Sequence, residues 1–218
     1  MECRRSTDVF FTFACALALL SFHLKPCNGA REGPKESTTS TDFVRTSCGA
    51  TEYPALCFSS LSAYAATIQS SPAQLADVAL SVTLARARSA SAALARAVAG
   101  GGMAPRVAAA VRDCVENMAD AVDELRESLA AMGHVMTTAA RAGGKKTEME
   151  NVAYLINSIQ TWVSAALTDD DTCMDGFAGG AMNGEVKDKL RSHVVNVAQL
   201  SSNALALING LASSLPRP

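Results

Sequence analysis

The chain has 218 residues, which is long enough for one domain of ordinary size with its own hydrophobic core. Hydrophobic residues make up 49% of it and aromatic residues only 5%, and alanine, the strongest helix former, supplies much of the difference. This composition favours closely packed helices over sheet. The formal net charge of −2 argues against a nucleic acid or an anionic membrane as a partner.

The N-terminus has the pattern of a secretory signal peptide, which we expect to span residues 1–30. Arg4 and Arg5 form a short basic region, residues 10–22 are mostly apolar, and the small residue Ala30 precedes a polar stretch. The apolar run is short for a transmembrane helix, although a retained signal anchor is the alternative. Cleavage there would remove three basic and two acidic residues and leave a soluble, secreted protein with a formal charge of −3.

Four of the seven cysteines remain after such a cleavage, namely Cys48, Cys57, Cys114 and Cys173. An even number of cysteines in an exported chain predicts two disulfides, and the sequence alone allows three ways of pairing them. Disulfides would also compensate for an alanine-rich core, which buries less apolar area per residue than a core of leucine and phenylalanine.

A short polar segment and a helical hairpin are predicted before the main body of the chain. Residues 31–41 are polar and contain Pro and Gly, so we expect them to form a flexible arm. Residues 42–70 follow as a hairpin of short helical pieces. The break falls at Tyr53-Pro54, because the residue before a proline is pushed out of the helical region.

Two long helices are predicted after the hairpin. The first spans about residues 72–99, with Ser71 suited to its N-cap, and it stops at three consecutive glycines. The second spans about residues 105–140 and carries apolar residues at spacings of three and four. Gly133 is expected to break or fray the last part of this helix.

Two further long helices are predicted after a flexible Gly-Gly-Lys-Lys stretch. The third starts near Thr147, with Glu150 three residues later as in a capping box, and the fourth starts near Glu185. Sustained apolar spacing of three and four is typical of nearly antiparallel helices, and strand-type alternation does not occur at useful length. The sequence therefore predicts an all-α fold, an up-and-down four-helix bundle over residues 72–213 that follows the hairpin.

The sequence contains no catalytic constellation, phosphate-binding loop or pair of histidines at metal-ligand spacing. We expect His134 to be exposed near a helix end and His193 to be a core or boundary residue on an apolar stripe. The run Asp169-Asp170-Asp171 lacks the alternating ligands of a calcium loop, so we expect it to be a solvated helix terminus. These patterns indicate a protein that is not an enzyme and binds no metal or cofactor.

Acidic residues of the second long helix form a more informative pattern. They recur at spacings of four, three and four, and we call them the acidic strip: Glu116, Asp120, Asp123 and Glu127. This spacing places them on one face of the helix, away from the apolar stripe. Two interpretations are open, an ordinary solvated face or a surface presented to a partner, and composition does not decide between them.

Four segments of the chain together resemble the plant invertase and pectin methylesterase inhibitor family. They are CGATEYPALC at residues 48–57, DCVENMADAVDEL at 113–125, WVSAALTDDDTCMDGF at 162–177 and LSSNALALING at 200–210. They occur in the order typical of the family and in register with all four cysteines. The resemblance covers about residues 42–213.

The resemblance implies the bundle fold, with residues 42–215 as an inhibitor domain and with the disulfides Cys48–Cys57 and Cys114–Cys173. It also implies a secreted inhibitor in the plant cell wall, which covers the substrate cleft of its target enzyme in a reversible 1:1 complex. A rigid helical face suits such binding, because little conformational entropy is lost. The positions that contact pectin methylesterase in family members match these residues here: Glu116, Asp120, Asp123, Thr172 and Asp175.

Pectin methylesterase is the expected partner, and acid invertase is the alternative. Many invertase inhibitors of the family carry a Pro-Lys-Phe segment, which this sequence lacks. The chain ends at Pro218 without a second domain, which favours a free inhibitor over the family's pro-regions fused to a methylesterase. The rivals are a bundle enzyme or ligand carrier, which needs a polar cluster inside the bundle, and a structural wall protein, which needs Pro-rich or other repeats.

Overall fold

The computed structural model describes residues 35–143, 145–176 and 185–215, and the expected signal peptide lies outside these residues. Over the described ranges the regular structure is entirely helical, which confirms the predicted all-α class. The elements in chain order are α2 (Lys35–Cys48), α3 (Pro54–Leu61), the 3₁₀ turn η2 (Ser62–Tyr64), α4 (Ala65–Ile68), α5 (Pro72–Ala99), α6 (Pro105–Ala142), α7 (Lys146–Gly176) and α8 (Glu185–Ser214).

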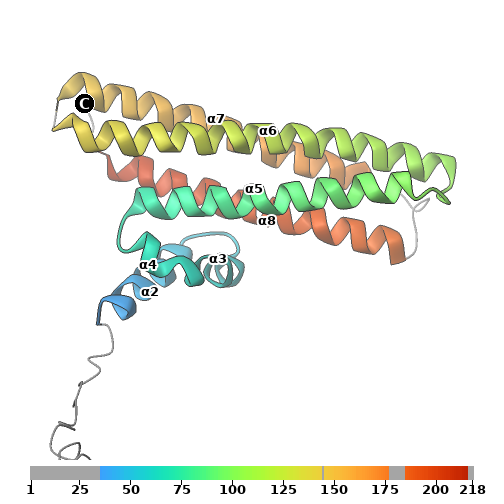
Figure 1. Ribbon diagram of the computed structural model, residues 1–218, viewed down its shortest axis with the longest axis horizontal. Coiled ribbons are helices and arrows are strands. Elements are labelled where there is room, and N and C mark those ends of the chain that lie inside the picture. The colour runs from blue at the N-terminus through green and yellow to red at the C-terminus, as the bar shows by residue number, and fades with distance from the viewer. Residues whose placement is uncertain (1–34, 144, 177–184, 216–218) are drawn as a thin grey trace, which may run out of the picture. The chain divides into compact units, whose positions relative to one another are not determined.

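The four long helices form the predicted up-and-down bundle (Figure 1). Each of α5, α6 and α7 packs against the helix that follows it, and α8 returns to pack against α5. Apolar stripes from all four helices meet in one core, because spacings of three and four place them on one face of each helix. Its largest inaccessible side chains include Leu80, Leu94, Met118, Leu125, Ile156, Ile159 and Ile208.

The ends of α5 follow the sequence signals closely. The Ser71 hydroxyl accepts a hydrogen bond from the backbone N–H of Gln74 at 3.3 Å, and Pro72 occupies the first turn. After the helix ends, Gly101 and Gly102 have φ angles of +67° and +79°. Only glycine adopts these angles without strain, so the three-glycine stretch allows the tight turn into α6.

Two helix boundaries differ from the sequence-based expectation. α6 continues through Gly133, because the neighbouring side chains of Met132 and Val135 are buried in the core. Their burial outweighs the cost of a helical glycine, which is about 1 kcal/mol. α7 begins at Lys146, one residue before the expected capping threonine, and the Lys146 ammonium lies 3.8 Å from the Glu150 carboxylate.

The N-terminal arm is shorter than the sequence indicated. α2 begins at Lys35 and therefore takes in seven of the residues expected to be flexible, whereas residues 31–34 lie outside the described part of the chain. Ser40, Val44 and Cys48 recur at a spacing of four along α2, and all three are buried. Packing of this buried face stabilises the helix in the polar N-terminal half of α2, which its composition alone does not predict.

The hairpin of α2, α3 and α4 packs on the side of the bundle formed by α5 and α8 (Figure 1). The disulfide Cys48–Cys57 joins α2 to α3, with 5.5 Å between the two Cα atoms. The Asn203 side chain on α8 accepts a hydrogen bond from the backbone N–H of Tyr53 and donates one to its carbonyl, both at 3.0 Å. A single side chain thus fixes the loop between α2 and α3 to the bundle.

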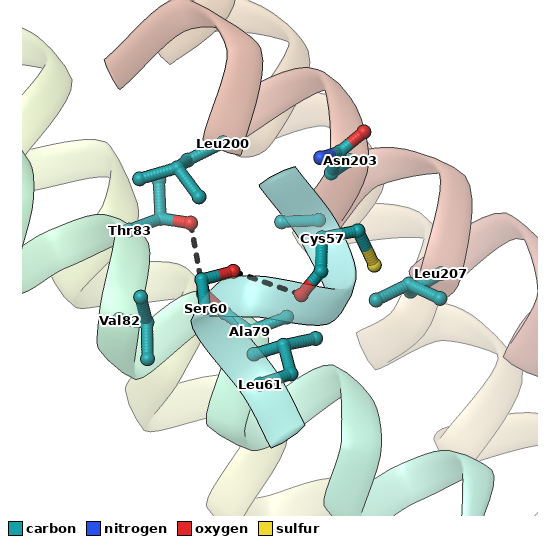
Figure 2. Close-up of a pocket in the computed structure, with 10 residues that line it drawn as sticks. Cys57, Ser60, Leu61, Ala79, Val82, Thr83, Leu200, Asn203 and Leu207 are labelled. Carbon is teal, nitrogen blue, oxygen red and sulfur yellow. Dashed lines mark hydrogen bonds between the residues drawn. The ribbon is translucent and has the colours of Figure 1, made fainter. Parts of the chain in front are cut away.

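The contact between the hairpin and the bundle is closely packed. Figure 2 shows the place where α3, α5 and α8 meet around a cavity of about 10 Å³, which has room for roughly one water molecule. The Ser60 and Thr83 hydroxyls at its wall donate to the carbonyls of Cys57 and Ala79, at 3.0 and 2.8 Å. This cavity is therefore too small for a small-molecule ligand, and both hydroxyls are satisfied within their own helices.

One described helix, α8, is long and apolar enough over Lys187–Ser214 to cross a membrane by length and composition. Half of its apolar stretch is buried inside the protein. Its packing against α5 and α7 accounts for this composition, because a bundle helix needs a broad apolar face.

Candidate functional site

Because the hairpin lies against α5 and α8, the outward faces of α6 and α7 form a second side of the bundle, which we call the open side (Figure 1). The disulfide Cys114–Cys173 joins these two helices across 59 residues of sequence, with 4.4 Å between the Cα atoms. Glu116 follows the first of these cysteines by two residues, and Thr172 directly precedes the second. The disulfide therefore joins the parts of α6 and α7 that carry the two predicted groups of binding residues.

The acidic strip lies on α6 as its spacing predicts. Its four carboxylates are exposed on the face opposite the buried residues Met118 and Leu125. The Asp123 carboxylate pairs with the Arg126 guanidinium one turn later, so part of its charge is balanced within α6. The strip is a row of fixed negative charges on a rigid helix, which is suited to meeting a cationic protein surface.

The two predicted binding residues on α7, Thr172 and Asp175, are also exposed on the open side. The Thr172 hydroxyl donates to the Thr168 carbonyl at 2.8 Å, which holds it against its own helix. All five predicted partner-binding residues thus lie on the outward faces of two adjacent helices.

The run of three aspartates lies inside α7, which continues to Gly176, so the expectation of a solvated helix terminus was wrong. Successive residues of a helix point about 100° apart, so three in a row cannot share one face. Asp169 lies near carboxylates of α6, Asp170 faces α8 and Asp171 lies near Tyr53 of the hairpin loop. Asp170 has no exposed surface.

Asp170 continues the buried stripe of α7, which sequence reasoning followed only as far as Ala166. From Ile159 onward the stripe runs at spacings of four, three, four and three: Ile159, Val163, Ala166, Asp170 and Cys173. The Ser201 hydroxyl of α8 donates to Asp170 Oδ2 at 3.1 Å, and Oδ1 has no hydrogen-bond partner within the described residues. Burial raises the pKa of Asp170 to about 8, so this carboxyl holds its proton in mildly acidic solution.

A second carboxyl of raised pKa lies at the seam between α6 and α7, and sequence reasoning missed it. Partial burial of Glu124, followed by the nearby carboxylates of Asp169, Asp120 and Glu127, raises its pKa to about 7. Burial and the charge of Asp120 also raise the pKa of Asp169. The open side therefore combines the exposed carboxylates of the acidic strip with two partly buried carboxyls of raised pKa, Glu124 and Asp169.

Two of the three histidines, His134 and His193, lie in the part of the chain that the structure describes. His134 is exposed on α6, as expected, and His193 is half-buried on α8. Within the described ranges, no group of three or more His, Cys, Asp or Glu side chains is placed to hold a metal ion. The chemistry available on the open side is charge and hydrogen bonding towards a partner.

Comparisons with known proteins agree with this architecture. The family model described as plant invertase/pectin methylesterase inhibitor matches residues 42–207. The chain is 42% identical over 213 residues to a 21 kDa protein of Daucus carota, covering 98% of each. It is 38% identical over 205 residues to pectinesterase inhibitor 11 of Arabidopsis thaliana, covering 93% of this chain and 94% of that one.

A solved structure shares the fold. The crystal structure of mutant form A of a pectin methylesterase inhibitor from Arabidopsis matches with a TM-score of 0.60 at 23% identity, covering 80% of this chain and 98% of that one. The protein therefore belongs to the plant invertase/pectin methylesterase inhibitor family, whose members are inhibitors and not enzymes. It is an inhibitor-like helical bundle with both of the disulfide pairings that the family resemblance implied.

Proposed function

We propose that the protein is a secreted inhibitor of pectin methylesterase, which binds the enzyme in a reversible 1:1 complex and covers its substrate cleft. Binding would regulate the methylesterification of pectin in the plant cell wall. The proposal draws on the family membership and on relatives named as pectinesterase inhibitors. The inhibitor would act by occupying space, so no covalent step or cofactor is needed.

The observation that carries the proposal is the placement of the five predicted binding residues on the open side of the bundle. Three of them, Glu116, Asp120 and Asp123, lie on α6, and Thr172 and Asp175 lie on α7. The hairpin contacts α5 and α8, so it leaves these residues accessible. Both helices are fixed by packing and by a disulfide, so little conformational entropy is lost when the surface binds.

The direct test is a paired inhibition assay of the full chain, expressed with its own N-terminus in a secretory host. The purified product is titrated against a plant pectin methylesterase and a plant acid invertase, and its N-terminus is read by mass spectrometry. We expect loss of methylesterase activity at an equimolar end point and a cleavage near residue 30. Inhibition of invertase alone would move the function to the alternative target, and inhibition of neither enzyme would refute the proposal.

The acidic strip is tested by a double amide variant, Asp120→Asn with Asp123→Asn. Removing two carboxylates is expected to slow association with the methylesterase by about tenfold at low salt, because surface charges mainly steer encounter. A stopped-flow or biosensor measurement at two salt concentrations reports this rate. The matched control is Asp42→Asn with Asp188→Asn, which removes two exposed carboxylates from α2 and α8. Equal association rates for the two variants would refute a role for the strip.

A further inference from the structure

α7 carries a second row of exposed residues, and the family resemblance implies a binding role only for the two at one end of it. Its members recur at spacings of three and four and all are exposed: Tyr154, Asn157, Thr161, Ser164, Thr168, Thr172 and Asp175. We call them the α7 row. The row lies opposite the buried stripe that includes Ile156, Val163 and Asp170, so it points straight out from the bundle.

The α7 row is unusual because it carries no charge over most of its length. Residues 151–168 contain no Asp, Glu, Lys, Arg or His, although this part of α7 has a fully exposed face. The outer face of a bundle helix is normally rich in charged side chains. Tyr154, at one end of the row, is 72% exposed. Depletion of charged residues is typical of the buried core of a protein interface, and tyrosine is one of the residue types favoured there.

The threonine and serine hydroxyls along the row already have hydrogen-bond acceptors. Thr161, Ser164 and Thr168 donate to the carbonyls of Asn157, Gln160 and Ser164, at 3.0, 2.7 and 3.0 Å. Covering these three side chains with another protein would leave no buried hydroxyl donor without an acceptor and would bury no charge. Each hydroxyl is also held in one rotamer, so little side-chain entropy remains to be lost on binding.

The row also indicates which partner covers it. Its last two members, Thr172 and Asp175, are residues assigned to the proposed docking site, and the uncharged part continues the same line along α7. The acidic strip runs along the neighbouring helix, which packs closely against α7. A partner seated on the strip and on Thr172 would therefore extend over the uncharged row without crossing the hairpin.

We infer that the α7 row as far as Tyr154 is the uncharged centre of the surface that docks on pectin methylesterase. The inference rests on the proposed function and assigns different roles in binding to the acidic strip and the α7 row. The acidic strip accelerates encounter, and the α7 row slows dissociation, because a surface that desolvates at little cost contributes mainly to the lifetime of a complex.

The test places one charge in the centre of the row, with Thr161→Arg in the full-length secreted protein. An unpaired charge buried at the interface is expected to raise the dissociation rate from methylesterase on the order of 100-fold and to slow association by a much smaller factor. Tyr154→Ala is expected to raise it by about 10- to 30-fold. The matched control is Ser89→Arg, which adds the same charge at an exposed serine of α5.

The outcomes separate this inference from the proposed function. If the unmodified protein inhibits the methylesterase and Thr161→Arg dissociates as slowly as Ser89→Arg, the inference is overturned while the proposed function stands. If the unmodified protein sediments as a dimer that Thr161→Arg converts to a monomer, a second copy covers the row and the inference is overturned. Unchanged circular dichroism and thermal midpoint for both arginine variants confirm that folding is not the cause of a loss.

Discussion

Two nearby residues of α8, Asn203 and Ser201, form hydrogen bonds to different parts of the fold. Asn203 faces the hairpin and satisfies both backbone groups of Tyr53 with its own donor and acceptor. Ser201, two residues earlier, faces α7 and donates a single hydrogen bond to the buried Asp170 carboxyl. The first contact is neutral and complete, whereas the second leaves Asp170 Oδ1 without a partner within the described residues.

The two contacts are expected to respond differently to pH. A neutral amide that is fully hydrogen-bonded contributes the same stability at any moderate pH. A buried carboxyl with one oxygen left unpartnered contributes more when protonated than when ionised, because one hydrogen bond does not compensate a charge in the core. The contact that Asn203 makes with Tyr53 is therefore expected to be insensitive to moderate changes of pH, and the α7–α8 contact is expected to weaken as the solution becomes alkaline.

Among the effects that do not depend on pH, the largest is expected from removing the two disulfides. Replacing Cys114 and Cys173 with alanine opens a loop of 59 residues and should cost about 4 kcal/mol of folding free energy in the chain-entropy model. Replacing Cys48 and Cys57 opens a loop of 9 residues and should cost about 2 to 3 kcal/mol. Urea unfolding followed by circular dichroism measures both values. A larger loss for the Cys48–Cys57 pair would contradict the loop-length argument.

An effect that depends on pH, with a definite sign, is expected for Asp170→Asn. The folded-state pKa of about 8 lies above the unfolded value of 3.8, so between these limits the unfolded chain releases a proton that the folded chain keeps. The unmodified protein should therefore lose stability as pH rises from 4 to 8, by up to about 1.4 kcal/mol per pH unit. Asparagine can still accept the Ser201 hydrogen bond and has no proton to lose, so the variant should be the more stable protein at pH 7.

Urea unfolding at half-unit steps between pH 4.5 and 8 measures this dependence. Charged groups that act on Asp170 are Asp169 and Asp171 on α7 and Glu124 on α6, and from α8 the Ser201 hydroxyl contacts it. Glu124→Gln is the control, because Glu124 titrates nearby with a pKa of about 7 and should account for part of the remaining slope. Parallel stability curves for the unmodified protein and Asp170→Asn would mean that the buried carboxyl does not control the pH response.

Sequence patterns predicted the bundle well because apolar spacing, glycine stops and the Ser71 cap are local signals. They predicted less where tertiary contacts decide. The polar N-terminal part of α2 is helical because one face of α2 is buried at Ser40, Val44 and Cys48. α6 remains helical through Gly133 although a glycine lowers helix stability. The acidic strip followed from spacing alone, whereas the surroundings of Asp170 depend on a serine 31 residues away in the sequence.

The smallest loss of stability is expected from removing the neutral hydrogen bonds between Asn203 and Tyr53. A carboxyl placed at position 203 is expected to make this contact sensitive to pH. Asn203→Ala removes two hydrogen bonds to Tyr53 and should cost about 1 to 2 kcal/mol, with the same value at pH 5 and pH 8. Asn203→Asp keeps an acceptor for the Tyr53 N–H and, when ionised, loses the donor to its carbonyl. Because position 203 is only 3% exposed, the new carboxyl should behave like Asp170 and make stability fall with rising pH. Unfolding curves of the two variants at pH 5 and pH 8 test both statements. A pH-dependent loss for Asn203→Ala, or a pH-independent one for Asn203→Asp, would show that unsatisfied burial is not what distinguishes the two sides of α8.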